Sequence, residues 1–398
     1  MTIHDLAPAG AVTRARVAVG VVFFVHGMLF ASWAAHIPQV KARLGIDDAA
    51  LGVALLGVPV GSVSAIGLTA YLVPRLGSRR MVQLVLVGYC LSGPLVGLAG
   101  SVPALFGALL LWGAFQGGLD IAMNTQAITV ERAVARPLMN GMHAWWGIGA
   151  FAGAGIGTLG VAIGVSLAVQ LTGLGVIAVF GAGWQALRML TDPRHARAEP
   201  DHARRRRMSV PILLLGGIAF AAMLCEGAAA DWSSVYLRES LGTSAAIGGL
   251  GYTSFTLALV LVRIFGDRLV ERHGARVLLP LLAGVGAVGF GVGLALDVAW
   301  AGVAGFFVLG LGLGAVVPLA FSAAGRLPGI HPGVGVAAVS GLGWAGFVCG
   351  PPLIGQLSAA FSLPAALTLV PALAAFIAIA TRHVAGLQPQ VKVPTCHA

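Results

Sequence analysis

Charged residues are scarce in this sequence. Lys, Arg, Asp and Glu together make up 10% of its 398 residues, whereas an ordinary soluble domain carries roughly 25%. Because 58% of the residues are hydrophobic, polar side chains are too few to cover a water-soluble globule, and the same composition excludes an intrinsically disordered chain. We therefore expect lipid to be the solvent for most of the protein.

Cysteine is also rare, with four residues and no CxxC motif, which argues against a disulfide framework or a cysteine-bound metal. No HExxH, GxSxG or kinase motif is present, so motifs give no support to an enzyme, and we expect no cofactor. Glycine, by contrast, is abundant at 58 residues, which is typical of helices that pack closely in membranes.

Apolar runs of about 20 residues, the length that crosses a bilayer, recur along the chain. They predict an all-α membrane protein with twelve transmembrane helices. The expected spans are 16–37, 50–73, 80–100, 103–127, 141–164, 167–188, 209–231, 245–265, 276–296, 300–322, 334–357 and 362–381.

Basic residues gather on one side of this arrangement. With the loops assigned alternately, 21 of the 24 Lys and Arg residues fall on the side of the termini, leaving Lys41, Arg43 and Arg238 on the other. The positive-inside rule then predicts that both termini are cytoplasmic. The formal net charge of +10 is therefore interpreted as a signal of orientation, and no nucleic-acid partner is expected.

The chain divides near its middle into two halves. A polar, basic stretch at 191–208 separates residues 1–190 from residues 209–398. We interpret these parts as two six-helix bundles joined by a cytoplasmic linker.

The two halves repeat each other at an offset of 197 residues, since segment 72–79 lines up with 269–276, and Gly113 with Gly310. The fold class is therefore expected to be two pseudo-symmetric six-helix bundles. Parallel repeats of six spans are typical of one large fold of secondary transporters.

The repeated loop carries a family resemblance. It reads Pro74-Arg75-Leu76-Gly77-Ser78-Arg79-Arg80 in the first half and Glu271-Arg272-His273-Gly274-Ala275-Arg276 in the second. Both copies resemble the Gly-x-x-x-Asp-Arg-x-Gly-Arg-Arg loop of the major facilitator superfamily, and the resemblance covers essentially the whole chain. The family aspartate is replaced by Pro74 in the first copy and by Glu271 in the second.

A finer resemblance lies in two regions, Ser32-Trp33 with Ile37-Pro38, and the stretch from Met123 to Trp146. Both look like the bacterial fucose-permease-like and rhizopine-transporter-like branches of the superfamily. In that fold spans 1, 4, 7 and 10 line a central cavity, and fucose-permease-like relatives use an acidic residue of span 4 for proton coupling.

Charges inside a span are costly, so each one suggests a function. Asp120 lies inside the fourth span, with Gln116 and Asn124 one turn away on the same helix face, and Glu226 lies inside the seventh. By the resemblance, Asp120 faces the substrate pathway, and we predict proton coupling by Asp120 and Glu226. The alternative is a structural carboxylate satisfied by neighbouring groups. Asp231 is expected to lie at the membrane interface, where water satisfies it.

The substrate cavity is predicted from polar and aromatic stripes. In span 1, His26, Phe30 and Trp33 recur on one helical face, an arrangement that suits a sugar or polyol but is also the ordinary signature of a buried helix. Gln116, Asn124 and Trp344 complete the predicted cavity. For three further residues a purely local role is favoured, namely His143, Trp146 and Tyr252.

A cytoplasmic gate is expected where loop arginines meet the end of span 4. By the resemblance, Glu131 and Arg132 form an ion-pair latch with the arginines of the first loop copy, and solvated surface pairing is the alternative. The residues assigned to this gate are Arg75, Arg79, Arg80, Glu131, Arg132, Glu271, Arg272 and Arg276. Arg263 and Asp267 are read as a local pair at the inner end of span 8.

These features predict a secondary active transporter of a small polar solute, such as a sugar, polyol or related metabolite, that works by proton symport. It is expected to act as a monomer in the plasma or inner membrane of a bacterium, with the solute, protons and the lipid bilayer as partners. Proton-driven efflux of amphipathic compounds is the alternative, favoured by Gly350-Pro351-Pro352. A membrane-embedded enzyme or sensor is a distant third, since the sequence contains no supporting motif.

Overall fold

The computed structural model describes residues 9–134, 138–191, 209–327, 330 and 332–384. In this part of the chain the secondary structure is helical throughout, without strands. Lipid offers no hydrogen bonds to the backbone, so a spanning segment must pair its own N–H and C=O groups, as a helix does. The expected linker at 191–208 lies outside the described residues except for Thr191.

The first half contains a series of helices that runs from the N-terminal end of the described chain to residue 186. They are α1 (Ala9–Ser32), η2 (Ala34–His36), α2 (Ile37–Leu44), α3 (Asp48–Leu55), α4 (Gly57–Leu76), α5 (Ser78–Leu98), α6 (Val102–Val134), α7 (Met139–Ala162) and α8 (Leu167–Ala186).

The second half follows the same plan. Its helices are α9 (Val210–Val235), η3 (Tyr236–Ser240), α10 (Ala245–His273), α11 (Ala275–Ala295), α12 (Ala299–Leu313), α13 (Val316–Ala324), α14 (Pro332–Ala360), α15 (Leu363–Leu367), α16 (Leu369–Ala380) and η4 (Thr381–His383).

Twelve segments of the described chain are long and apolar enough to cross a membrane, so the predicted fold class is confirmed. Several boundaries differ from those expected. The first segment, Gly10–Leu44, continues through η2 and α2, and the fourth, Val102–Val134, is a single helix that carries Glu131 and Arg132 inside it. Charged residues at helix ends fall outside the lipid, so a prediction from hydropathy alone ends these two helices too early in the sequence.

The internal repeat is visible in the backbone. Gly45 and Gly242 have φ angles of 61° and 63°, and Gly77 and Gly274 have φ angles of 81° and 79°. Each pair is separated by the offset of 197 residues found in the sequence. These angles lie in a region that glycine adopts without strain, so the two halves turn the chain with the same backbone device.

Glycines also set the closest helix contacts. On α7, Gly149, Gly153 and Gly157 lie one turn apart, and a Cβ on any of them would run into a backbone carbonyl of α1. The equivalent helices of the second half, α14 and α9, meet in the same way, because a Cβ on Gly346 would run into the carbonyl of Phe220. Small residues therefore allow α1 to pack on α7, and α9 on α14, backbone against backbone.

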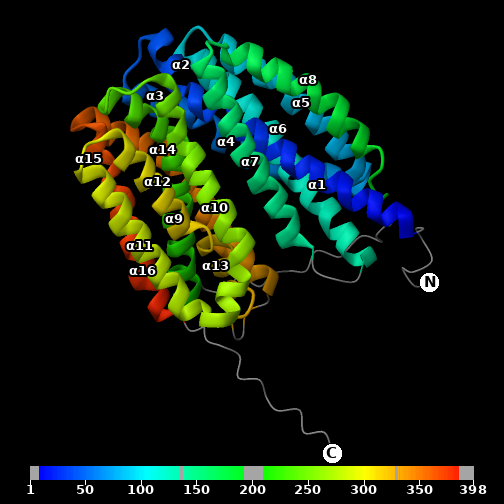
Figure 1. Ribbon diagram of the computed structural model, residues 1–398. Helices are drawn as coiled ribbons and strands as arrows, with labels where there is room; N and C mark the ends of the chain where they lie inside the picture. Colours follow the sequence, from blue (N-terminus) through cyan, green and yellow to red (C-terminus); the bar gives the residue numbers. More distant parts are fainter. Residues whose placement is uncertain (1–8, 135–137, 192–208, 328–329, 331, 385–398) are drawn as a thin grey trace, which may run out of the picture.

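Most helix packing is within a half, and the two halves meet mainly through two helix pairs, α7 with α10 and α3 with α14. Figure 1 shows the halves side by side, close together near α2, α3 and α15 and farther apart toward the opposite end. At that opposite end α1 begins and α16 ends. We call it the terminal end.

Candidate functional site

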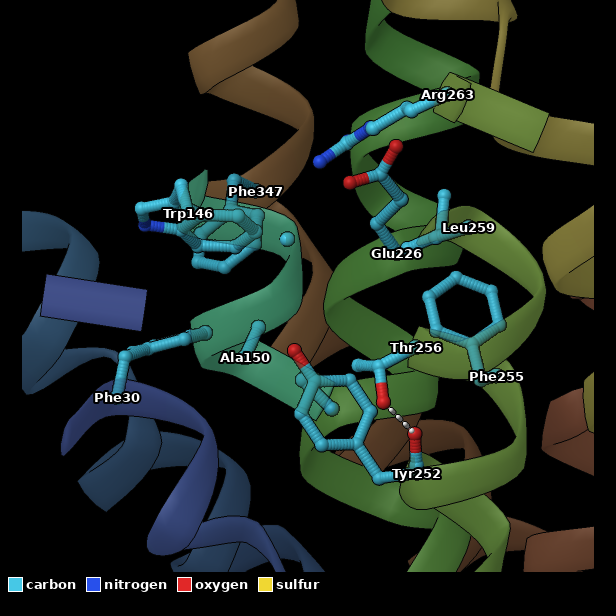
Figure 2. Close-up of a pocket in the computed structure, with 12 residues that line it drawn as sticks. Phe30, Trp146, Ala150, Glu226, Tyr252, Phe255, Thr256, Leu259, Arg263 and Phe347 are labelled. Carbon is cyan, nitrogen blue, oxygen red and sulfur yellow. Dashed lines mark hydrogen bonds between the residues drawn. The ribbon is translucent and has the colours of Figure 1, made fainter. Parts of the chain in front are cut away.

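A pocket lies between the two halves, where helices of both come together. It contains about 390 Å³ of space not filled by atoms, part of which is open to solvent. We call it the central pocket (Figure 2). It is lined by Phe30, Trp146, Gly147, Ala150, Glu226, Ala230, Tyr252, Phe255, Thr256, Leu259, Arg263 and Phe347.

Aromatic rings form much of the wall. Phe30 of α1 and Phe347 of α14 face each other across the halves, with ring centroids 6.5 Å apart. Tyr252 and Phe255 of α10 stack at 6.1 Å. Trp146 of α7 completes this wall (Figure 2). Such a surface can accept the C–H face of a small solute while polar groups bind elsewhere on it.

A histidine holds Trp146 in place. The indole Nε1–H of Trp146 donates to Nδ1 of His26 at 2.7 Å, and Nε2 of His26 lies 3.3 Å from the backbone oxygen of Gln116. These two contacts fit a neutral imidazole that accepts at Nδ1 and donates at Nε2. His26 is therefore behind the wall of the central pocket, joining α1, α6 and α7, and does not line it.

Glu226 and Arg263 are the charged residues of the lining. Glu226 is on α9 and Arg263 is on α10, and Figure 2 shows their charged ends directed toward each other. Arg263 lies near the end of the span Ala245–Gly266, and α10 continues beyond it to His273. The expected local pair of Arg263 with Asp267 stays a prediction. The side chain of Asp267 lies outside what the structure describes.

The other predicted acid lies away from the central pocket. Asp120 is half-buried on α6, where its Oδ1 accepts from Asn124 Nδ2 at 3.2 Å, and the same nitrogen donates to the backbone oxygen of Asp120 at 2.8 Å. Gln116, on the same face, accepts from Ser62 of α4 at 3.4 Å. The predicted polar stripe therefore exists, but its partners are within the first half.

Of the six predicted cavity residues, Phe30 lines the central pocket. Trp33 is 2% exposed and belongs to the core of the first half. Trp344 packs on Phe347 with ring centroids 5.9 Å apart and so lies behind the lining. Sequence reasoning gave Trp146 and Tyr252 only local roles, although both line the pocket.

At the terminal end, none of the ion pairs that the structure gives for the described residues joins Glu131 to the loop arginines Arg75, Arg79 and Arg80. Glu131 Oε2 instead accepts from the backbone N–H groups of Leu138 and Met139, at 2.7 and 3.2 Å, where α7 begins. Arg75 lies 3.3 Å above the ring of Tyr71. A carboxylate at a helix N-terminus is favourable because it satisfies free N–H groups.

The remaining residues of the predicted gate lie apart from this cap. Arg79 donates to the backbone oxygen of Leu187. The side chain of Glu271 lies outside the described residues. The others are exposed at the surface, namely Arg80, Arg132, Arg272 and Arg276.

The end opposite the termini is closed by polar contacts between the halves, which the sequence analysis missed. Lys41 of α2 bonds to Asp48 of α3 at 2.5 Å and to Glu239 of η3 in the other half. Ser358 of α14 donates to Asp48 across the same junction. We call Lys41, Asp48, Glu239 and Ser358 the closed end. The one available signal was that Lys41 is among three bases placed on that side.

Deeper contacts reinforce the closed end. Ser234 of α9 donates to the backbone oxygen of Ala34 at 2.7 Å. A Cβ on Gly52 of α3 would lie 3.2 Å from the Cα of Gly355 on α14, and one on Gly355 would lie 3.1 Å from the Cα of Gly52. The halves therefore touch here backbone to backbone, with few side chains between them.

Known proteins similar to this chain include transporters. An uncharacterized MFS-type transporter of Yersinia pestis is 33% identical over 385 residues, covering 96% of this chain and 98% of the relative. Membrane protein MosC of Rhizobium meliloti is 33% identical over 380 residues, covering 94% and 91%. No family model matches the chain.

Solved structures show the same fold at low identity. The nucleoside transporter NupG matches with a TM-score of 0.67 at 12% identity, over 92% of this chain and 98% of that one. A bacterial homolog of the human lysosomal transporter Spinster, in an inward-facing and unoccupied conformation, matches with a TM-score of 0.67 at 16% identity, over 96% and 95%.

Proposed function

The chain belongs to the major facilitator superfamily of membrane transporters, and from this premise we propose that it carries a small polar solute together with protons by alternating access. The solute is a sugar, polyol or related metabolite. The protein is a multi-pass membrane transporter with transporter relatives. We place it in the bacterial inner membrane as a monomer with both termini in the cytoplasm, because the basic loops gather on that side.

The observation that supports this proposal most is the position of the central pocket. It is lined by α1 and α7 from one half and by α9, α10 and α14 from the other. A solute bound there contacts both halves, so its binding energy can favour one relative position of the halves over another. We propose that residues 1–190 and 209–398 rock against each other around it.

The two ends of the molecule supply the gates of this cycle. We assign the closed end, with Lys41 between Asp48 and Glu239, to the outer gate. The inner gate comprises the loop arginines and Glu131 at the terminal end. Contacts that exist in one state and separate in the other are a physical way to bias two conformations.

Proton coupling is assigned to Glu226, with Asp120 as a second site. Glu226 lines the central pocket, and a carboxyl group kept from water favours its neutral form. A carboxyl group that meets water on one side and then on the other can therefore load and release a proton in each cycle. Asp120 keeps its carboxylate near Asn124 and contributes through the first half.

The test is proton movement in proteoliposomes. Purified protein is reconstituted with a pH-sensitive dye inside, and sugars, polyols, organic acids and amino acids are added in turn under an imposed pH gradient. Symport predicts solute accumulation that a protonophore abolishes. Glu226→Gln is expected to end gradient-driven accumulation. The matched control is Asp231→Asn, an acid on the same helix that does not line the central pocket.

Efflux of amphipathic compounds is the second candidate, because most of the pocket lining is aromatic or aliphatic. The same vesicles distinguish the two. Accumulation of polar solutes down the proton gradient supports symport. Efflux would replace symport if the protein exchanges lipophilic cations for protons and does not transport polar solutes. In that case Glu226→Gln and Asp120→Asn should both abolish the exchange.

A further inference from the structure

The central pocket contains one cation and one anion among its described lining residues, Arg263 and Glu226. They belong to neighbouring helices, α10 and α9, and Figure 2 shows the guanidinium directed toward the carboxylate. In the described part of the chain they do not form an ion pair within 4 Å. Each group is therefore placed to bind something other than its neighbour.

One hydrogen-bond donor of Arg263 has no partner among the described residues. Its Nε is buried and has no hydrogen-bond partner, and its guanidinium carbon lies 5.8 Å from the ring of Trp146. A guanidinium presents its N–H donors in a planar fork that matches the two oxygens of a carboxylate. A buried donor without a partner is costly, so a ligand that supplies an acceptor there gains affinity.

We propose that the central pocket binds a small hydroxylated monocarboxylate, such as a sugar acid, and that Arg263 binds its carboxylate group. This inference rests on the proposed function, because it names the solute class of the same site. One guanidinium balances one negative charge, which favours a carboxylate over a doubly charged phosphate ester. Hydroxyl groups of the solute meet Glu226, Tyr252 and Thr256, and its C–H face meets the rings.

Glu226 controls when Arg263 is free to bind this anion. When ionised, Glu226 balances the charge of Arg263 and repels a carboxylate in the pocket. When protonated, it leaves the guanidinium without an ionised partner among the described lining residues and can donate a hydrogen bond to a solute hydroxyl. From α10, Tyr252 also interacts electrostatically with this pair and with Asp231. Arg263 acts on His143 of α7, and Cys225 adjoins Glu226 on α9.

The charge balance has a measurable consequence. A proton carried by Glu226 and a monocarboxylate carried by Arg263 together add no net charge to the pocket. Transport of one of each is therefore electroneutral and responds to a pH gradient but not to a membrane potential. A neutral sugar or polyol carried with one proton would instead move one positive charge per cycle.

Binding is tested with solutes that share a carbon skeleton. Purified full-length protein is titrated at several pH values with D-gluconate against D-glucitol and with D-glucuronate against D-glucose, and the emission of its tryptophans and its melting temperature are followed. We expect each carboxylate to bind about 10- to 100-fold more tightly than its neutral partner, as charged hydrogen bonds provide. Glucose 6-phosphate tests the phosphate alternative. Equal affinities within each pair, no binding of either carboxylate, or tighter binding of the phosphate would overturn the proposal.

Variants identify the residue responsible. Arg263→Gln is expected to remove the preference for the carboxylate and leave the affinity for the neutral partner unchanged, while Arg263→Lys keeps the charge and part of the preference. Glu226→Gln is expected to bind gluconate without dependence on pH. Melting curves of the unliganded variants report folding. A preference that survives in folded Arg263→Gln contradicts the assignment.

Transport by the unmodified protein provides a test that needs no variant. Gluconate uptake driven by a pH gradient, with no current on a supported membrane, supports the proposal. Proton-coupled uptake of glucitol with a positive current would leave the proposed symport intact and overturn the assignment of a carboxylate. Absence of any proton coupling, with gluconate still bound through Arg263, would overturn the symport and leave the binding assignment standing.

Discussion

The closed end gives the sharpest prediction, which concerns Lys41. Its ammonium group lies between Asp48 of its own half and Glu239 of the other half. Lys41→Met removes the positive charge and leaves two carboxylates facing each other across the junction. We expect this variant to shift the population toward conformations in which this end is open.

The size of the expected population shift depends on how far the charged side chains are exposed to water. The side chains of Lys41 and Asp48 are 11% and 16% exposed, whereas that of Glu239 is 40% exposed. The Lys41–Glu239 contact is therefore partly screened by water and contributes about 1 kcal/mol or less. Repulsion between the two remaining carboxylates adds about 1–2 kcal/mol at the dielectric of a protein surface. A total of about 1–3 kcal/mol changes the equilibrium about 5- to 150-fold. A closed population of about 99% would fall to between about 95% and 40%.

The assay is a distance measurement between spin labels on the two halves. Labels at Ala42→Cys and Ala360→Cys occupy exposed positions near the junction. Cys349, which is exposed, and Cys396 are replaced by serine, while Cys90 and Cys225 are buried. We expect Lys41→Met to add a longer component to the distance distribution in lipid nanodiscs.

The matched control is Arg43→Gln on the same helix. Arg43 donates to the backbone oxygens of Gly97 and Ala99, both within the first half, so its loss is expected to leave the distances unchanged. A distance distribution of Lys41→Met identical to that of the parent protein would contradict this role of Lys41. A shift seen only in Arg43→Gln would contradict it as well.

Three other contacts lead to predictions. Gly153→Ala places a methyl group against the backbone carbonyl of Met28, whereas a Cβ on Gly155 meets nothing within 4 Å. We therefore expect Gly153→Ala to lose about 1–3 kcal/mol of stability. It should melt several degrees below the control variant, Gly155→Ala. His26→Phe leaves the indole N–H of Trp146 without its acceptor and is expected to weaken solute binding and shift tryptophan emission, whereas unchanged titrations would show that the indole needs no support. Glu131→Ala removes the acceptor for the first N–H groups of α7 and is expected to lower the stability of this helix end by about 0.5–2 kcal/mol. The loss should be seen as faster hydrogen exchange at Leu138 and Met139. Glu131→Gln should give an intermediate exchange rate.

The fold could be predicted from the sequence because lipid constrains it strongly. Long apolar runs must become helices in a bilayer, and the repeated glycines, such as Gly45 with Gly242, mark equivalent turns. Helix ends could not be predicted as well, since residues such as Glu131 continue α6 beyond the apolar run.

The pocket was predicted only in part. Glu226 and Phe30 stood out because they lie inside spans, and both line the central pocket. Arg263 was expected at the end of its span, and its place in the pocket lining depends on how the two halves dock. Lys41 and Glu239 lie 198 positions apart, and no periodicity within a span shows that two such residues meet. That contact is set by how the halves dock.

The close approach of Gly52 and Gly355 has a consequence for how the closed end opens. At this point of the junction no side chain of one helix is inserted into the other. The two helix surfaces can therefore separate or slide without a prior change of side-chain rotamers. The activation barrier for parting is then set by a few polar bonds, which break quickly. We expect a methyl group on either glycine to favour conformations in which this end is open, because a Cβ on Gly52 would lie 2.5 Å from the carbonyl oxygen of Pro351 and one on Gly355 would lie 2.5 Å from that of Asp48.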